Sequence, residues 1–228
     1  VKAYQIMSVL EQLEPFIQPK HIIVLLHNGM GTIEKVKEKL PNNPLIAATR
    51  SYGALKLDAD TLTETGLGHT HLGWLSNVDM RLKQSIEPIL SALLPPSKWH
   101  QNIGLALWNK LAINAVINPL TAIHNLKNGE LAKLKYNTII FDICYEIAIV
   151  MQALGYPADN LELFKNVQRV ITATANNYSS MHQDLKFQRR TEIEFINGYV
   201  TSQATELNIK VPFNQRLLKQ IRQLEQPH

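Results

Sequence analysis

The feature that most constrains this fold is the segment of residues 104–124, GLALWNKLAINAVINPLTAIH. At helical spacing its apolar side chains cover most of the circumference, and Lys110 is the only residue that carries a full charge at neutral pH. A helix that is apolar nearly all round belongs in the interior of a protein. The segments that follow also have helical patterns. We therefore predict that residues 99–228 form an all-α domain built around this helix.

The same helix carries a polar stripe. Lys110, Asn114 and Asn118 follow one another at intervals of four residues, so each lies about 40° round and about 6 Å along the axis from the last. Burying an unpaired amide costs about 1–3 kcal/mol, and an unpaired ammonium costs far more. The stripe must therefore meet either polar partners on another helix or a ligand, and Lys110 favours an anionic or carbonyl ligand. Pro119 removes a backbone donor, so we expect it to bend or end the helix and to free carbonyls near the stripe.

The first part of the chain alternates between helix and strand. Residues 4–17 have helical spacing, and the apolar run at 22–26 precedes a glycine turn. A short helix at 32–40 and a second apolar strand at 45–51 continue the alternation. Continuously apolar strands are typical of parallel sheets that are buried on both faces. The pattern predicts an α/β layer fold.

The pattern changes after the second strand. Glycine and polar interruptions divide residues 52–74 into short strands, which we interpret as an antiparallel extension of the sheet. A helix at 79–94 ends at Pro95-Pro96, and a strand or connector follows. We place the domain boundary there, which gives domains 1–98 and 99–228. Beyond it we expect helices at 104–124, 129–134, 137–155, 159–176, 180–208 with a break, and 212–226.

Composition excludes several functions. The net charge is +4, but lysine and arginine are scattered, which argues against a nucleic-acid-binding protein. Cys144 is the only cysteine, so the chain has no intrachain disulfide and no cysteine-based zinc site, and it fits a reducing cytoplasm. No apolar run approaches the ~18 residues of a membrane span. His69 and His71 would share one strand face, but no third ligand at a supporting spacing completes a metal site.

Several blocks of sequence resemble the ketopantoate reductase (2-dehydropantoate 2-reductase) family. They are WNKLAINAVINPLTAIHNLKNGEL, HNGMGTIEKV, NNYSSMHQD, RRTEIEFINGYV and IKVPFN, in the family's order and spread over essentially the whole chain. The resemblance implies part of a Rossmann-like, doubly wound NADP-binding domain, followed by an all-α domain of the 6-phosphogluconate-dehydrogenase-like type. It also implies NADPH-dependent reduction of 2-dehydropantoate (ketopantoate) to pantoate, on the route to pantothenate and coenzyme A.

The resemblance assigns roles to single residues. Lys110 matches the acid that protonates the reduced ketone oxygen, and burial should depress its pKa while a nearby carboxylate raises it. Glu192 matches a glutamate near the nicotinamide ribose or Lys110, although taken alone it is typical of a solvated helix residue. Ser180 taken alone is typical of a helix N-cap. The positions that match substrate-binding residues are Lys110, Asn114, Asn118, Asn128, Asn177 and Ser180.

Other matched positions concern the cofactor and the scaffold. Asn28 follows a predicted strand, where ligands gather in open α/β sheets. Lys2 and Gly53 match weaker cofactor contacts. Glu146 and Asp184 fall on acidic positions of the family, and we interpret both as structural or supporting residues. Cys144 lies on an apolar helix, where an inert core residue is expected.

The chain departs from the family at its start. The strand, GxGxxG turn and helix that hold the pyrophosphate do not occur in this sequence, nor do about two βαβ units of ~30 residues each. We therefore expect the chain alone to bind NADPH weakly. Two alternatives to the assigned reaction remain: reduction of another branched 2-oxo acid, and a non-catalytic helical association domain. The apolar helices could also pair two chains into a homodimer.

Overall fold

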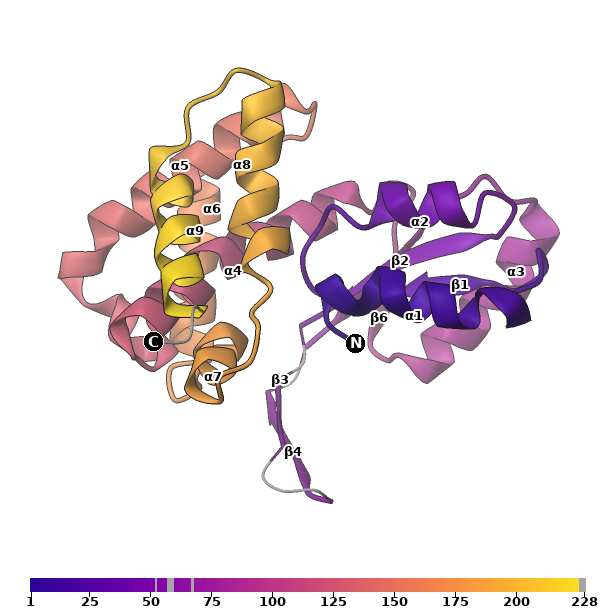
Figure 1. Cartoon of the computed structure of the whole chain (residues 1–228), viewed down its shortest axis with the longest axis horizontal. Helices are drawn as coiled ribbons and strands as arrows, with labels where there is room; N and C mark the ends of the chain where they lie inside the picture. The colour runs from indigo at the N-terminus through magenta and orange to yellow at the C-terminus, as the bar shows by residue number, and fades with distance from the viewer. Residues whose placement is uncertain (52, 57–59, 67, 226–228) are drawn as a thin grey trace. The chain divides into compact units, whose positions relative to one another are not determined.

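The computed structural model describes residues 1–51, 53–56, 60–66 and 68–225. The chain divides into two compact units (Figure 1). The first unit comprises Val1–Asn28 with Thr32–Leu107, and the second comprises Gly29–Gly31 with Trp108–His228. All of the described strands belong to the first unit. The α/β character of the first unit and the helical character of the second confirm the predicted fold class.

A four-stranded mixed sheet organises the first unit. Its strands are β1 (Ile23–Leu25), β2 (Leu45–Arg50), β5 (Thr70–Trp74) and β6 (Ser97–Trp99), in the order β1-β2-β5-β6. β1 and β2 are parallel, β2 and β5 are antiparallel, and β5 and β6 are parallel. The parallel start and the antiparallel addition of β5 were both predicted.

The prediction for the two preceding short strands is wrong. β3 (Gly53–Lys56) and β4 (Leu62–Gly66) pair with each other in a separate two-stranded sheet (Figure 1). Glycine and polar interruptions mark the ends of strands, but they do not specify which strand is the partner. Tyr52 and Leu57, the outer residues of the first predicted strand, lie outside the described residues.

Helices cover both faces of the four-stranded sheet. α1 (Ile6–Leu13) and α2 (Ile33–Lys39) pack on one face, and α3 (Met80–Leu93) packs on the other. In β2, Leu45 belongs to the first core and Ile46 to the second. Successive strand residues point to opposite faces, so a continuously apolar strand supplies two cores at once. The predicted helix at 4–17 is α1 extended by short 3₁₀ helices at both ends, η1 (Ala3–Gln5) and η2 (Glu14–Phe16).

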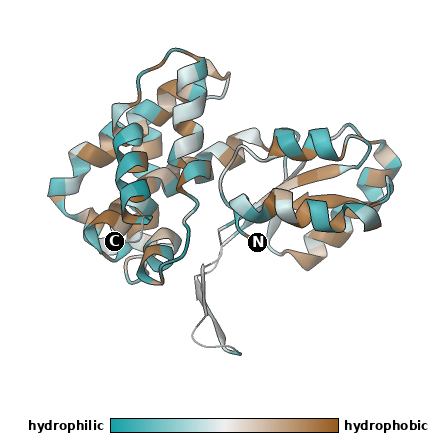
Figure 2. Cartoon of the chain, viewed as in Figure 1, coloured by the Kyte–Doolittle hydropathy of each residue, from teal (hydrophilic) through white to brown (hydrophobic). Residues whose placement is uncertain are grey.

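The second unit is built from helices around α4 (Gly104–His124). Buried side chains of α4 include Trp108, Leu111, Val116 and Leu120. The α-helices that follow it are α5 (Asn137–Ala153), α6 (Asn160–Ala173), α7 (Ser180–Lys186), α8 (Asn197–Glu206) and α9 (Pro212–Glu225). α8 and α9 lie side by side (Figure 1), and the amphipathic α9 mixes hydrophilic and hydrophobic residues along its length (Figure 2).

Short 3₁₀ helices replace one predicted α-helical stretch and occupy the predicted break in another. The predicted helix at 129–134 consists of η3 (Asn128–Ala132) and η4 (Leu134–Tyr136). The expected break within 180–208 contains η5 (Ile193–Phe195), and α7 ends before Gln188, whose φ of 53° is left-handed. Among the described helices, none combines the length and apolar character needed to cross a membrane.

Candidate functional site

α4 carries the predicted polar stripe into the second unit. Asn118 is buried, while Lys110 and Asn114 are half-buried. Thr121, which is fully buried, continues the stripe three residues beyond Asn118. The stripe is therefore buried at its Asn118 end and half-buried at its Lys110 end.

Lys110 is the charged group at the start of this stripe. Its pKa is lowered from 10.5 to about 8 because burial disfavours the ammonium, and the carboxylate of Glu192 opposes part of that shift. Glu192 is itself buried, at 4% exposure, immediately before η5. Both directions were predicted from the sequence. An ammonium with a pKa close to neutral can hold a proton at physiological pH and still donate it.

Pro119 does not end the helix, because α4 continues to His124. Proline lacks the N–H that would bond the carbonyl of Ala115 four residues earlier. Asn197, the first residue of α8, donates from Nδ2 to that carbonyl oxygen at 3.0 Å. The prediction that Pro119 frees a carbonyl near the stripe is confirmed, but the group that bonds to it is a protein amide.

Asn128 and Asn177 are joined directly. The Asn128 N–H donates to the Asn177 carbonyl at 2.9 Å, and Asn128 Nδ2 donates to Thr174 Oγ1 at 2.9 Å. A Cβ on Gly129 would lie 2.7 Å from Ala175 Cβ, so this close approach of η3 to the α6–α7 loop requires glycine. The buried Oδ1 of Asn128 has no hydrogen-bond partner among the described residues. That oxygen is enclosed by protein, so its acceptor capacity is unused in this structure.

The N-cap of α7 is Ser179 and not Ser180. Ser179 Oγ accepts a hydrogen bond from the His182 N–H at 3.1 Å, and its backbone is extended. Ser180 is the first helical residue and is exposed. The interpretation of Ser180 as a cap is therefore wrong by one residue. Two adjacent serines fit the same capping pattern, and only the backbone conformation distinguishes them.

Glu146 and Asp184 make structural contacts, as we interpreted them. The Glu146 carboxylate accepts hydrogen bonds from the Phe213 N–H at 2.7 Å, the Asn214 N–H at 2.9 Å and Asn214 Nδ2 at 2.7 Å. It thereby satisfies backbone donors at the start of α9. Asp184 Oδ1 lies 3.3 Å from Nε of Arg189.

Sequence reasoning missed four buried polar residues of this unit. Asn197 donates to both the Ala115 carbonyl and Asn214 Oδ1, and the Thr121 and Ser179 hydroxyls lie 2.7 Å apart. Thr121 could have been predicted from the sequence, because it lies three residues beyond Asn118 on the same helix face. No sequence pattern predicted Asn197 and Asn214, since their partners are distant in sequence.

The matched cofactor positions Lys2, Asn28 and Gly53 belong to the first unit. Asn28 is half-buried and follows β1, at the carboxyl end of the parallel strands. Lys2 is half-buried directly before η1, and its N–H donates to Gln5 Oε1 at 2.8 Å. Gly53 opens β3, where it pairs with Gly66 beside a register irregularity.

The other candidate reactive side chains of the described residues are two histidines, His69 and His71, and the thiol of Cys144. His71 Nδ1 lies 2.8 Å from Nε2 of His100, whereas His69 is exposed. No group of three or more histidine, cysteine, aspartate or glutamate residues in the described ranges could hold a metal ion. Cys144 is fully buried, and burial raises the pKa of its thiol to about 12, as expected of an inert core residue.

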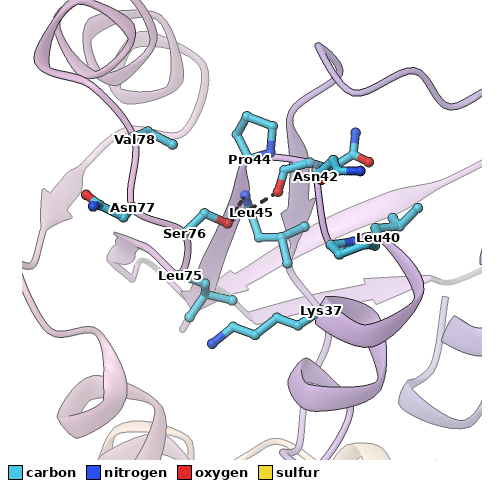
Figure 3. A pocket seen from close by; sticks show the side chains of 11 residues that line it. Lys37, Leu40, Asn42, Pro44, Leu45, Leu75, Ser76, Asn77 and Val78 are labelled. Carbon is cyan, nitrogen blue, oxygen red and sulfur yellow. Dashed lines mark hydrogen bonds between the residues drawn. The ribbon is translucent and has the colours of Figure 1, made fainter.

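A cavity of about 460 Å³ opens in the first unit between the end of α2, the start of β2 and the end of β5 (Figure 3). At its wall, Ser76 Oγ accepts from the Leu45 N–H at 3.0 Å and donates to the Asn43 carbonyl at 3.3 Å. The cavity lies at the amino ends of the parallel strands β1 and β2, because β2 begins there, whereas Asn28 lies at their carboxyl ends. Ligands of open α/β sheets bind at the carboxyl ends of parallel strands, so this cavity is not the candidate site.

Known proteins match this chain along almost its whole length. Family profiles described as "Ketopantoate reductase PanE/ApbA" and "Ketopantoate reductase PanE/ApbA C terminal" match residues 1–77 and 102–225. A curated 2-dehydropantoate 2-reductase of Vibrio cholerae is 41% identical over 226 residues, which are 99% of this chain and 76% of that protein.

Solved structures share the fold. A ternary complex of D-mandelate dehydrogenase with NADH and anilino(oxo)acetate has a TM-score of 0.90 at 21% identity, and the match covers 99% of this chain and 74% of that one. A dimeric ketopantoate reductase from Staphylococcus aureus has a TM-score of 0.83 at 20% identity, covering 99% of this chain and 75% of that one.

Proposed function

Because this chain belongs to the ketopantoate reductase family, we propose that it reduces the C2 ketone of 2-dehydropantoate to the hydroxyl of pantoate, with Lys110 as the proton donor. The observation that carries the proposal is the pKa of about 8 for Lys110, on a buried polar stripe and beside Glu192. A lowered pKa is of no use to a lysine that only stabilises the fold. It is useful to an acid catalyst, because such a group must lose and regain a proton near neutral pH.

A bound nicotinamide supplies the hydride. As the hydride arrives at C2, negative charge develops on the ketone oxygen. The Lys110 ammonium stabilises that charge and then donates a proton to the oxygen. Glu192 keeps the lysine protonated before the reaction, because its carboxylate raises the pKa that burial lowers. Without it, a smaller fraction of the enzyme would carry the proton at physiological pH.

The amides of the second unit bind the substrate. Asn114 and Asn118 lie along α4, and the hydrogen bond between Asn128 and Asn177 places their two segments side by side. Asn128 is proposed as a further substrate contact, for which its buried Oδ1 must become accessible when the substrate binds. Ser180, exposed at the start of α7, would donate to the substrate carboxylate. Neutral groups of this kind bind a small polar acid without burying a second charge.

The cofactor proposed is NADPH. Asn28 fits the nicotinamide end, since it is half-buried and lies at the carboxyl end of the parallel strands. The D-mandelate dehydrogenase of the same fold carries NADH, which supports a nicotinamide cofactor of either kind. Lys2 and Gly53 are proposed as further contacts of the first unit, and Glu192 as a contact of the second.

Replacing Lys110 by alanine tests the assignment. Loss of a positioned acid should lower kcat for 2-dehydropantoate by about 10²- to 10⁴-fold, measured as NADPH oxidation at NADPH concentrations high enough to saturate a weak site. The matched control is Lys219→Ala, which removes an exposed lysine of α9 and should leave kcat unchanged. Near-normal turnover by a folded Lys110→Ala enzyme would exclude Lys110 as the acid.

A second candidate substrate is another branched or aromatic 2-oxo acid. The likeness to D-mandelate dehydrogenase, with a TM-score of 0.90, favours testing it. Purified enzyme should be assayed with 2-dehydropantoate, 2-oxoisovalerate and benzoylformate under identical conditions. We expect the highest kcat/KM for 2-dehydropantoate, and a higher value for either of the others would replace the proposed substrate.

The homodimer is supported by exposed apolar side chains on neighbouring elements of the second unit. Phe141 and Tyr145 of α5 and Leu161 of α6 are exposed by 42%, 55% and 50%, and Phe141 contacts Phe164 edge-on. The Staphylococcus aureus relative is dimeric. Light scattering should give twice the monomer mass, and Phe141→Glu should reduce it to the monomer mass. A monomeric wild-type protein would contradict the proposal.

A further inference from the structure

A buried pair of hydroxyl groups joins α4 to the start of α7. Thr121 Oγ1 and Ser179 Oγ lie 2.7 Å apart, and the two residues are 0% and 5% exposed. Thr121 Oγ1 donates to Ser179 Oγ and also lies 2.7 Å from the Ile117 carbonyl, while Ser179 Oγ accepts from the His182 N–H at 3.1 Å and donates to the Asn118 carbonyl at 3.5 Å. Each hydroxyl has one proton, so this arrangement uses both protons inside the protein.

The pair lies between residues that the proposed function assigns to the substrate. Thr121 follows Asn118 by three residues on α4, and Thr121 Oγ1 also lies 3.1 Å from the Asn118 carbonyl. Ser179 lies between Asn177 and Ser180 in sequence and is 3.5 Å, through Oγ, from the same carbonyl. A single contact therefore connects the amide stripe of α4 to the turn that presents Asn177 and Ser180.

A second contact joins the same two segments. His182 Nε2 lies 2.7 Å from Asn125 Oδ1, and Asn125 follows the last residue of α4 with a left-handed φ of 52°. The His182 ring is buried and stacks on Tyr178, with centroids 4.4 Å apart. The start of α7 is therefore held to the end of α4 at two separate points.

We infer that Thr121 and Ser179 are positioning residues that set the distance between Asn118 and the Asn177–Ser180 turn, and thereby the affinity for the 2-oxo acid. This inference rests on the proposed function. Neither hydroxyl would need to touch the substrate, because both of their protons are already used. Their effect should appear in substrate binding more than in proton transfer, since Lys110 lies eleven residues before Thr121 on α4.

Thr121→Val removes the hydroxyl and keeps the shape of the side chain. We expect KM for 2-dehydropantoate to rise about tenfold, the effect of one lost hydrogen bond, with kcat within about twofold of wild type. Thr121→Ser keeps the hydroxyl and should restore KM. The control is Thr205→Val on α8, whose Oγ1 donates to the Thr201 carbonyl at 2.8 Å, a similar bond on an exposed helix face. It should change neither constant.

The two residues should also act as one unit. Ser179→Ala should raise KM as Thr121→Val does, and the double variant should raise it no further than the larger single effect. A purely structural role would lower the folded fraction, and hence apparent kcat, and leave KM unchanged. That result, or strictly multiplicative effects on KM, would overturn the inference.

Asn118→Ala separates this inference from the proposed function. If wild type turns over 2-dehydropantoate and Asn118→Ala raises KM while Thr121→Val does not, the positioning role is wrong and the function stands. If wild type shows no turnover and no binding of pantoate by calorimetry, the function itself is wrong. Should Thr121→Val fold poorly, Thr121→Ala measured beside Thr121→Ser gives the same comparison.

Discussion

Two buried polar regions of the helical unit differ in how their polar groups are hydrogen-bonded. At the start of α9, the Glu146 carboxylate accepts hydrogen bonds from one side-chain and two backbone donors. Burial lowers the pKa of Lys110 on α4, and Asn128 Oδ1 in η3 has no hydrogen-bond partner among the described residues. The first region satisfies helix donors that the fold would otherwise bury unpaired. The second holds a partly buried ammonium and a buried amide oxygen, which is costly for stability, and it consists of residues proposed to bind the substrate.

The sharpest test of this contrast is Glu146→Gln. The amide would present a donor to N–H groups that require an acceptor, so at least one hydrogen bond at the start of α9 is lost and a donor is left buried. We expect the free energy of unfolding to fall by about 3 kcal/mol, measured by urea denaturation. The KM for 2-dehydropantoate should not change. A raised KM at unchanged stability would place Glu146 in the substrate site instead.

Asn128 and Asn197 each have an Oδ1 with no hydrogen-bond partner among the described residues, so the effects of replacing them can be compared directly. Asn197 is 0% exposed and Asn128 is 7% exposed. Asn197→Ala should lower stability by about 2 kcal/mol, because it frees the Ala115 carbonyl and Asn214 Oδ1, and it should leave KM unaltered. Asn128→Ala should raise KM about tenfold and lower stability less. If both variants changed stability and KM alike, Asn197 could not be assigned to the fold and Asn128 to the substrate site.

The smallest expected effect concerns pH. In the proposed reaction Lys110 donates a proton only from its ammonium form, so kcat/KM should fall as pH rises through its pKa of about 8. Glu192 raises that pKa, and Glu192→Gln should therefore move the falling limb to lower pH. The measurement is a pH profile of kcat/KM for both proteins. A limb that stays in place, or moves upward, would show that Glu192 does not act on Lys110.

The sequence predicted the features that depend on local periodicity. The bounds of α4, its apolar surroundings and the direction of the Lys110 pKa shift all follow from spacing and burial within one helix. Pairing across the chain could not be predicted in the same way. The β3–β4 hairpin was assigned to the wrong sheet, and the choice between Ser179 and Ser180 as the cap depends on one backbone conformation. Both outcomes are decided by non-local packing, for which a local pattern carries no information.

Pro119 has a consequence for how this sequence can change over time. The carbonyl that it leaves open at Ala115 is bonded by Asn197, 82 residues further along the chain. If another residue at position 119 supplied a backbone N–H, that donor would compete with Asn197 for the same oxygen, and Asn197 would then be needed only for its hydrogen bond to Asn214 Oδ1. The two positions should therefore be inherited as a pair. In relatives where the proline is replaced, position 197 is where a compensating substitution should be sought.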